Sequence, residues 1–410
     1  MQAVAPGGNQ FSIELPAEEE LLCRQYARSR SLLCLAELGT LLSVLLLLTS
    51  TGAARFLLDG SRALLSPRWA ADLAYLLLIG IIVRAVQLPA HFAGEHWLER
   101  RFGLSRQRFG QWALEWLTRS AVFGLVTLAL LFAVTETLRW WMWLIVPWSL
   151  AFLFGRNLFH DYVYNPVLAL FYPVHFLRRE TFILPGLGKR TLPVYQVQVS
   201  HRTRRANASI RLRGERTAIY VTDTLIDEFT DGEERVVMAH EFGHLYDHLH
   251  LETRTPSGIA QAHRKLMLGS GQLLAGLMSL LILHGAAPWL GLSGAHDLAG
   301  VPLLAALTLL LARSFDPFLC EEARRDEKDA DQYALAITGD VPNYVSVMRK
   351  LRWMNLEEST AHPISRFFFD THPSYSERVH LAKVYRRRHS QRKGGYHWRG
   401  WRCIQRHGRR

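Results

Sequence analysis

Apolar and charged residues are segregated along this chain of 410 residues. Six apolar blocks alternate with polar segments, and such blocks are typical of membrane-spanning helices, which need about 20 residues to cross a bilayer. Only the first two blocks comfortably reach that length, so the shorter ones must borrow flanking residues. The blocks are Ser31–Ala54, Trp69–Pro89, Ser120–Val134, Trp140–Gly155, Leu266–Leu283 and Leu298–Ala312.

Two long polar segments, Arg156–Lys265 and Arg313–Arg410, separate or follow these blocks. In the first, alternating or β-branched apolar residues predict strands at Leu192–Val199 and Thr217–Val221. The polar segments therefore contain an α+β domain, and the apolar blocks predict an α-helical polytopic membrane bundle.

Helix-start and helix-stop signals define two helices in the polar segments. Asp231, with Glu234 three residues later, is the pattern of an N-cap and predicts a helix that continues through an apolar run. A second helix is predicted to begin at Asp316-Pro317, because proline favours the first helical turn, and to end at Gly339.

The distribution of positive charge predicts the topology. Cytoplasmic loops of membrane proteins are enriched in lysine and arginine, and the loop after the second block carries five arginines between Arg100 and Arg119. Six crossings then place both polar segments on the cytoplasmic side, where they can form one domain interrupted by a membrane hairpin. The loop from Arg55 to Arg68, which carries three arginines on the outer side, is an exception to this rule.

Composition and charge add two constraints. The chain is 49% hydrophobic and 20% charged, and its four cysteines have no CxxC spacing, so we expect free thiols and neither a disulfide framework nor a zinc knuckle. Much of the net charge of +12 lies in the basic tail 386–410. We interpret this tail as solvated or attracted to anionic membrane lipids, and we expect no nucleic-acid partner because no recognisable nucleic-acid-binding fold is present.

The sequence His240-Glu241-Phe242-Gly243-His244 carries the strongest chemical signal. Residues four apart share one helix face, so both imidazoles can reach one metal ion while Glu241 points at its open coordination position. Zinc suits such a site, because it polarises a scissile carbonyl and lowers the pKa of a bound water. A helix with two surface histidines is the simpler alternative.

Two candidates exist for the third metal ligand. His250 lies six residues after His244, as in metzincins, but Asp247 replaces the glycine that bends the chain there, and a continued helix would turn His250 to another face. Glu327 and Asp331 are four residues apart, so Glu327 can bind zinc while Asp331 orients an imidazole. Taken alone, their segment also fits a charged, solvated helix face.

At this point the sequence resembles the membrane-integral CAAX prenyl endopeptidases and their bacterial relatives, including HtpX-like zinc metallopeptidases of the gluzincin class. The resemblance extends from about Glu99 to Lys383. Its motifs are the loop Glu99–Gln107, Ala206–Ala208 followed by Ile219–Leu225, the zinc helix His240–His244, the R-x-x-E-x-x-A-D helix Arg324–Asp331, and His372-Pro373 with Glu377-Arg378.

The resemblance implies roles for individual residues. Glu327 becomes the third zinc ligand beside His240 and His244, and Asp331 its supporting partner. His372 and Arg378 become catalytic candidates that stabilise an oxyanion or grip the substrate backbone. Asn207 and Ala208 would bind the peptide, although Asn207 also fits a simple turn. Two departures are noted: six spans are counted where the eukaryotic enzymes have seven, and no part of the sequence points to prenylated substrates, so CAAX specificity is not carried over.

We therefore predict a multi-pass membrane protein of a bacterial inner membrane that cleaves membrane-tethered or unfolded polypeptides with a zinc-activated water and Glu241 as general base. A true CAAX prenyl endopeptidase is the alternative; a silent scaffold, or a transporter using Glu37, Asp72 and Arg84, explains fewer residues. The sequence does not define the oligomeric state. The predicted domains are 1–155 (about four transmembrane helices), 156–265 (first part of the protease), 266–313 (transmembrane hairpin), 314–385 (second part) and 386–410 (basic tail).

Overall fold

The computed structural model describes residues 16–140, 147, 159–184, 188–212, 216–252, 270–271 and 274–390. The chain forms two compact units, and each is built from segments far apart in sequence. We call residues 1–28, 172–262 and 319–410 the α+β unit, and residues 29–171 and 263–318 the helical unit.

Long apolar helices dominate the helical unit. Among the described residues, three segments are long and apolar enough to cross a membrane: α1 (Ala17–Ser50), the continuous segment Arg68–Arg101, and Phe109–Thr137 within α5 (Phe109–Trp140). They confirm the first three predicted blocks, and the helices run past each block because their polar ends also favour helix. The segment Arg68–Arg101 comprises α3 (Arg68–His91), the π-helix η1 (Phe92–Leu98) and α4 (Glu99–Arg101).

The later predicted blocks are matched only in part. The block Trp140–Gly155 lies almost wholly outside the described residues, as does the start of Leu266–Leu283, whose described part belongs to a shorter apolar helix, Leu274–Leu290. Leu298–Arg313 passes the length test only together with Asp316–Thr338, to which it is joined at a bend of 42°. That bend separates α11 (Val301–Arg313) from α12 (Asp316–Thr338).

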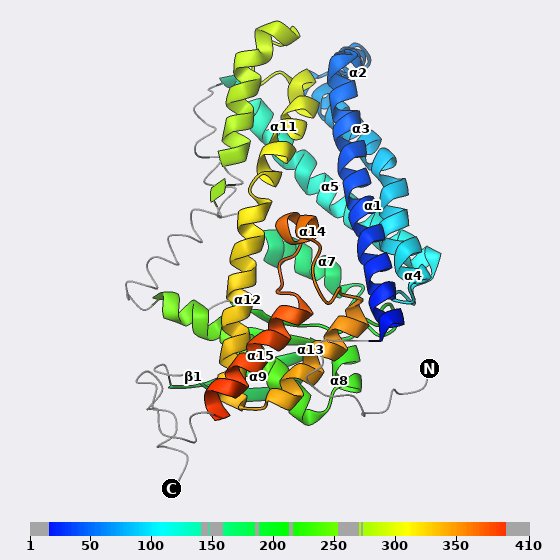
Figure 1. The fold of residues 1–410 in the computed structure, drawn as a ribbon. Helices are drawn as coiled ribbons and strands as arrows, with labels where there is room; N and C mark the ends of the chain where they lie inside the picture. Colours follow the sequence, from blue (N-terminus) through cyan, green and yellow to red (C-terminus); the bar gives the residue numbers. More distant parts are fainter. Residues whose placement is uncertain are drawn as a thin grey trace. The chain divides into compact units, whose positions relative to one another are not determined.

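Shorter elements complete the helical unit. One end of the unit carries α2 (Ala53–Leu64), remote from α4 (Figure 1). Tyr75 of α3 is fully buried and donates a hydrogen bond to the carbonyl of Leu298, so α3 is fixed to the start of the last apolar segment. The remaining short elements are η3 (His160–Tyr164), α7 (Asn165–Ala169), η5 (Ala287–Leu290) and η6 (Leu298–Gly300).

The α+β unit contains a four-stranded mixed sheet in the order β1-β2-β4-β3. The pairs β1–β2 and β3–β4 are antiparallel and β2–β4 is parallel, with Val194 opposite Ile219. The predicted strands correspond to β2 and β4, whereas β1 and β3 were not predicted because arginines and polar residues interrupt their alternation. The strands are β1 (Val174–Leu184), β2 (Gly188–Val197), β3 (Ala208–Arg211) and β4 (Ala218–Thr222).

Helices cover this sheet and share its core. Phe242 of α9 (Asp231–Glu252) is fully buried and packs against Phe182 of β1 with ring centroids 4.5 Å apart. Helix α13 (Val341–Asn355) packs against α9, and α15 (Tyr375–Ser390) packs against α13 (Figure 1). Two shorter helices, α8 (Asp223–Glu228) and α14 (Pro363–Phe368), belong to the same unit. The core therefore fixes α9 by one face and leaves its opposite face for chemistry.

The start of α9 differs in detail from the prediction. Thr230, one residue before the predicted cap Asp231, forms a reciprocal capping box with Glu233: its backbone N–H donates to the Glu233 carboxylate, and the Glu233 N–H donates to its hydroxyl. The predicted bounds of α12 are confirmed, since it begins at Asp316 and Gly339 follows it with a φ of 63°. Only glycine adopts that backbone conformation without strain.

Candidate metal centre

Two imidazoles project from the face of α9 opposite Phe242. His240 and His244 are one helical turn apart, and their rings lie perpendicular with centroids separated by 4.9 Å. Phe242, midway between the two histidines, lies on the other side of the helix, where it is buried in the core. The simpler alternative of two surface histidines is not what the fold presents, since both side chains are largely covered, at 12% and 22% exposed.

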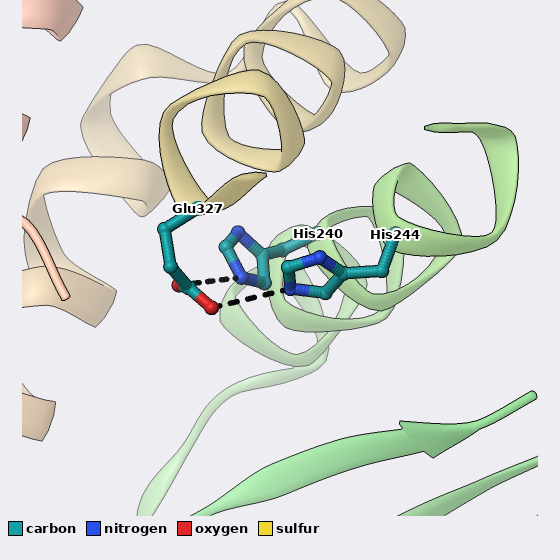
Figure 2. A group of neighbouring side chains, drawn as sticks. All are labelled: His240, His244 and Glu327. Carbon is teal, nitrogen blue, oxygen red and sulfur yellow. Dashed lines mark ion pairs between the residues drawn. The ribbon is translucent and has the colours of Figure 1, made fainter. Parts of the chain in front are cut away.

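The third group comes from α12. The Glu327 carboxylate places one oxygen 3.3 Å from Nε2 of His240 and the other 3.4 Å from Nε2 of His244 (Figure 2). The three side chains offer ligand atoms that all lie within 4.8 Å of one another. Two neutral imidazole nitrogens and one carboxylate oxygen are the donor set of a catalytic zinc ion, and these residues fit it. The side chains predicted from spacing are therefore brought together.

Glu327 is held in its anionic form. Burial opposes this charge, but hydrogen bonds from His240 and His244 outweigh burial and hold the pKa of the carboxyl well below its usual range. A carboxylate that stays ionised is a competent metal ligand over the whole physiological pH range.

Asp331 lies one turn after Glu327 and is fully buried. One of its oxygens is 3.0 Å from Nδ1 of His240, so the opposite ring nitrogen, Nε2, faces Glu327. Burial alone would lower the pKa of His240, but the carboxylates of Asp331 and Glu327 raise it to about 10 in the absence of a metal. A carboxylate bonded to the far nitrogen of a metal-binding histidine fixes the orientation of its ring.

Arg378 of α15 lies beneath both carboxylates. Its guanidinium is 2.6 Å from Glu327 and 3.3 Å from Asp331, and only 11% of its side chain is exposed. Despite burial, which favours the neutral form, these anions raise its pKa. Arg378 therefore has two carboxylate partners, Glu327 and Asp331, and its contact with Glu327 holds that carboxylate in place.

Tyr344 of α13 is a member of this network that sequence reasoning did not identify. Its side chain is fully buried, and burial together with the neighbouring Asp331 carboxylate raises the pKa of its hydroxyl. Its only sequence signal was a place in an apolar helix pattern, which does not distinguish it from an ordinary core residue.

His372 occupies the open side of the centre. Its side chain is 64% exposed, and Nε2 lies 3.5 Å from an oxygen of Glu327. The other ring nitrogen shares a hydrogen bond with the hydroxyl of Thr371. Of the predicted catalytic residues it is therefore the one that a bound substrate can reach most directly.

Glu241 stands beside the metal-binding group without belonging to it. Its side chain is buried, and burial raises the pKa of the carboxyl, while the two histidines oppose that shift. The backbone amide of Ile210 in β3 also hydrogen-bonds to Glu241. This contact brings one strand of the sheet directly to the predicted general base.

The substrate-binding candidates are the first residue of that strand, Ala208, and the residue before it, Asn207. Asn207 is exposed, and its carbonyl accepts a hydrogen bond from the backbone N–H of Thr222, which pairs it with the end of β4. Ala208 begins β3 and pairs with Val221. In the described sheet β3 is an edge strand, because β4 is its one partner.

The close approach of α9 and α12 depends on Gly243. A Cβ atom added at this position would lie 2.8 Å from the Cα of Ala330 and 3.1 Å from its carbonyl oxygen. These are backbone atoms and cannot rotate away. The glycine between the two histidines therefore lets α12 come near enough for Glu327 to reach them.

We expect Gly243→Ala to force the two helices apart, which lowers zinc content, peptidase activity and stability. Overpacking of this kind costs about 1–3 kcal/mol. The measurements are metal analysis and thermal unfolding of the purified chain. Gly232→Ala on the same helix is the matched control, since its added Cβ would meet only the side chain of Asn343. Equal zinc content and activity in both variants would contradict the packing role of Gly243.

The structure does not support the metzincin alternative for the third ligand or the transporter alternative for the function. The α9 helix continues through His250 to Glu252, so the chain does not turn after His244 as a metzincin requires. In the helical unit Asp72 contacts Arg62 and Arg68, and Glu37 lies 3.5 Å from His91. Asp72 is thus paired with α2 and with its own helix, and Glu37 of α1 lies beside a histidine of α3.

Comparison with known proteins gives a consistent result. Residues 184–385 match peptidase family M48, and residues 9–171 match the CAAX prenyl protease N-terminal domain, described as having five membrane helices. A metalloprotease of Bacillus subtilis (strain 168), YhfN, described as uncharacterized, is 26% identical over 337 residues, which are 77% of this chain and 74% of the relative. The fold is similar to the crystal structure of S. mikatae Ste24p, with a TM-score of 0.66, 17% identity and coverage of 90% and 89% of the two chains.

Proposed function

This chain is a metalloprotease of the M48 type with a CAAX prenyl protease N-terminal membrane domain, and on that premise we propose that it is a zinc endopeptidase acting on membrane-tethered or unfolded polypeptides. The observation that carries the proposal is the convergence of His240, His244 and Glu327, with the buried carboxyl of Glu241 beside them.

The proposed metal ligands are the Nε2 atoms of His240 and His244 and the carboxylate of Glu327. A zinc ion held there would act as a Lewis acid toward a scissile carbonyl and lower the pKa of an attacking water. Asp331 orients the His240 ring, and Arg378 holds the carboxylates of Glu327 and Asp331. These contacts fix the ligand geometry before substrate arrives, which reduces the reorganisation required during reaction.

The proposed proton transfers use Glu241. Its carboxylate accepts the proton from the attacking water and later donates it to the nitrogen of the leaving amine. Burial raises its pKa and so strengthens it as a base. His372, exposed on the open side, donates a hydrogen bond to the oxyanion that develops on the scissile carbonyl. In this proposal Glu241 transfers the proton, and His372 stabilises the negative charge on the carbonyl oxygen.

Peptide binding is proposed at β3. An extended substrate adds to this edge strand, with backbone hydrogen bonds supplying affinity without a fixed sequence. The contact between the Ile210 amide and Glu241 supports the proposal, because it places the strand next to the base. Asn207 and Ala208, at the start of β3, would then bind the substrate backbone.

The direct test is a peptide-library digest by the full chain purified in detergent. We expect cleavage of unfolded peptides that stops when a chelator removes the metal and returns when zinc is added in a stoichiometric amount. An enzyme that cleaves at an undiminished rate after metal analysis shows no bound ion would contradict the proposal.

A CAAX endopeptidase is the second candidate function, favoured by the match of residues 9–171 to the CAAX prenyl protease N-terminal domain. We expect farnesylated and unmodified versions of one peptide to be cleaved at similar rates, because the proposed contacts at β3 are with peptide backbone. Asn207→Ala should slow both reactions, and Arg190→Ala on β2 serves as a control for an exposed substitution in the same sheet. A strong preference for the farnesylated peptide would favour the CAAX function.

The chain is a multi-pass integral membrane protein, and we propose that its α+β unit faces the cytoplasm of a bacterial cell. The argument is the cluster of arginines between Arg100 and Arg119, since cytoplasmic loops are the ones rich in positive charge. A reporter fused near Gly294 should accordingly report the opposite side from one fused after Glu321.

A further inference from the structure

A polar pocket lies in the helical unit, apart from the metal centre. Its volume is about 140 Å³, and it is formed by α2, the start of α3 and the segment before η6. The lining residues are Arg55, Arg62, Arg68, Ser293, His296, Asp297 and Leu298. Three arginines and a histidine around one small cavity are the donors that recognise a phosphate group.

The charges in and below this pocket do not cancel. Arg55 pairs with Asp297 at 2.7 Å, and Arg62 pairs with Asp72 at 2.9 Å. Arg68 reaches the same Asp72 only at 3.8 Å, and its side chain is 66% exposed. Three arginines thus face two carboxylates, which leaves one positive charge in excess before His296 is counted. The two pairs fix Arg55 and Arg62, while Arg68 is placed to meet an anion.

The elements that form the pocket, and the short helix η5 before it, also carry exposed apolar side chains. On α2, Ala54 and Leu58 are buried, so one face of this helix packs against the rest of the unit. Other large side chains next to the pocket residues in sequence are exposed to solvent: Phe56 at 76%, Leu64 at 85%, Trp69 at 56% and Trp289 at 90%. A short amphipathic helix, with exposed aromatic residues on it and on the neighbouring elements α3 and η5, is typical of the membrane interface, where lipid headgroups lie.

The position along the chain agrees with this location. The membrane-crossing helix α1 ends at Ser50 and α3 begins at Arg68, so α2 and the pocket arginines occur where the chain leaves and re-enters the apolar layer. Phosphate groups of lipids lie at that level. The pocket also accounts for the three arginines in the loop Arg55–Arg68, which are an exception to the charge rule for outer loops.

We propose that this pocket binds the phosphate headgroup of an anionic membrane lipid. Arg68 and the remaining donors of Arg62 contact the phosphate oxygens, and the exposed residues of α2 contact the acyl chains. The site fixes α2 and the loop before η6 to the membrane interface. It is independent of the metal centre, because none of its residues belongs to the proposed peptidase machinery.

The test uses the full chain, loaded with zinc and purified in detergent. Its unfolding temperature is measured against rising concentrations of dihexanoyl phosphatidylglycerol, dihexanoyl phosphatidylcholine and inorganic phosphate, because a ligand of the folded state raises it in a concentration-dependent way. We expect stabilisation by phosphatidylglycerol, little by phosphatidylcholine, and only a weak effect of phosphate alone.

Two variants and one control identify the site. Arg68→Gln should weaken the apparent affinity for phosphatidylglycerol by roughly three- to tenfold, the value of a partly exposed charge-assisted contact. The double variant Arg62→Gln/Asp72→Asn removes the Arg62 guanidinium. The second substitution neutralises its buried partner Asp72, so that the loss of Arg62 does not leave a buried carboxylate without that arginine. Arg108→Gln, an exposed arginine before α5 and outside the pocket, is the control and should bind as the unchanged chain does.

Three outcomes would overturn the proposal. Equal stabilisation by both lipids would exclude selective recognition of an anionic headgroup. Unchanged affinity in both pocket variants would place the lipid elsewhere. Full stabilisation by inorganic phosphate would make free phosphate the ligand. Peptidase activity is measured in parallel, and its loss or retention in the metal-ligand variants leaves the lipid result unaffected.

Discussion

Replacing Glu241 with glutamine is expected to abolish peptide hydrolysis while leaving the zinc content of the purified chain unchanged. Glutamine has nearly the same shape as glutamate but cannot accept the proton of an attacking water. A positioned general base contributes about 10²- to 10⁴-fold to a rate, so kcat should fall by that factor. The zinc content should remain, because the metal-binding group consists of His240, His244 and Glu327.

A matched control separates this effect from a general disturbance of α9. Glu234 lies on the same helix and its side chain is also largely buried, but it pairs with Arg178 of β1 at 2.7 Å. Glu234→Gln should therefore lower stability slightly and leave kcat near that of the unchanged chain. A Glu241→Gln variant with near-normal turnover would remove Glu241 from the role of base.

Replacing Glu327 is expected to remove the metal ion, whereas replacing Glu241 is expected to leave it bound. Glu327→Ala removes one of three ligands, and zinc content should fall from about one ion per chain toward zero. It also removes the nearer of the two carboxylate partners of Arg378 and leaves Asp331 at 3.3 Å as the other, so stability should fall as well. Glu327→Gln, which keeps a hydrogen-bond acceptor for Arg378, is therefore measured alongside it.

Zinc analysis after dialysis and thermal unfolding together separate ligand loss from misfolding. Glu327→Gln should stay folded and lose zinc, and Asp331→Asn should weaken zinc binding by about 10- to 100-fold as a supporting residue does. Arg325→Gln, an exposed change on the same helix, is the control and should keep both zinc and activity. Full zinc occupancy in folded Glu327→Gln would exclude Glu327 as a ligand.

Local sequence signals were sufficient where chemistry and helix geometry act over short distances. The spacing of four residues predicted that His240 and His244 share a face, and the structure confirms that they do. Turn and cap residues located both ends of α12 because Gly339 adopts a positive φ there. The start of α9 was placed one residue late, since Thr230 and Asp231 are both good caps and only the contact with Glu233 distinguishes them.

Strand prediction was weaker for a physical reason. In β1 the charged residues Arg178, Arg179 and Glu180 interrupt the apolar alternation, and the strand is held by its ladder to β2, which extends from Val174 opposite Val197 to Leu184 opposite Gly188. This ladder joins β1 to the next strand across a hairpin, so the alternation of residues within β1 alone does not record it. The short strand β3 likewise depends on β4 for its existence.

The sequence by itself determined the kind of chemistry, because ligand type and helical spacing are properties of neighbouring residues. Only the tertiary structure decided that Glu327 reaches both histidines, that Arg378 lies under its carboxylate, and that Gly243 gives α12 the space to approach. These contacts join α9, α12 and α15. They arise from packing two helices without a Cβ between them and from pairing buried charges, which depend on atoms that are adjacent only after the chain has folded.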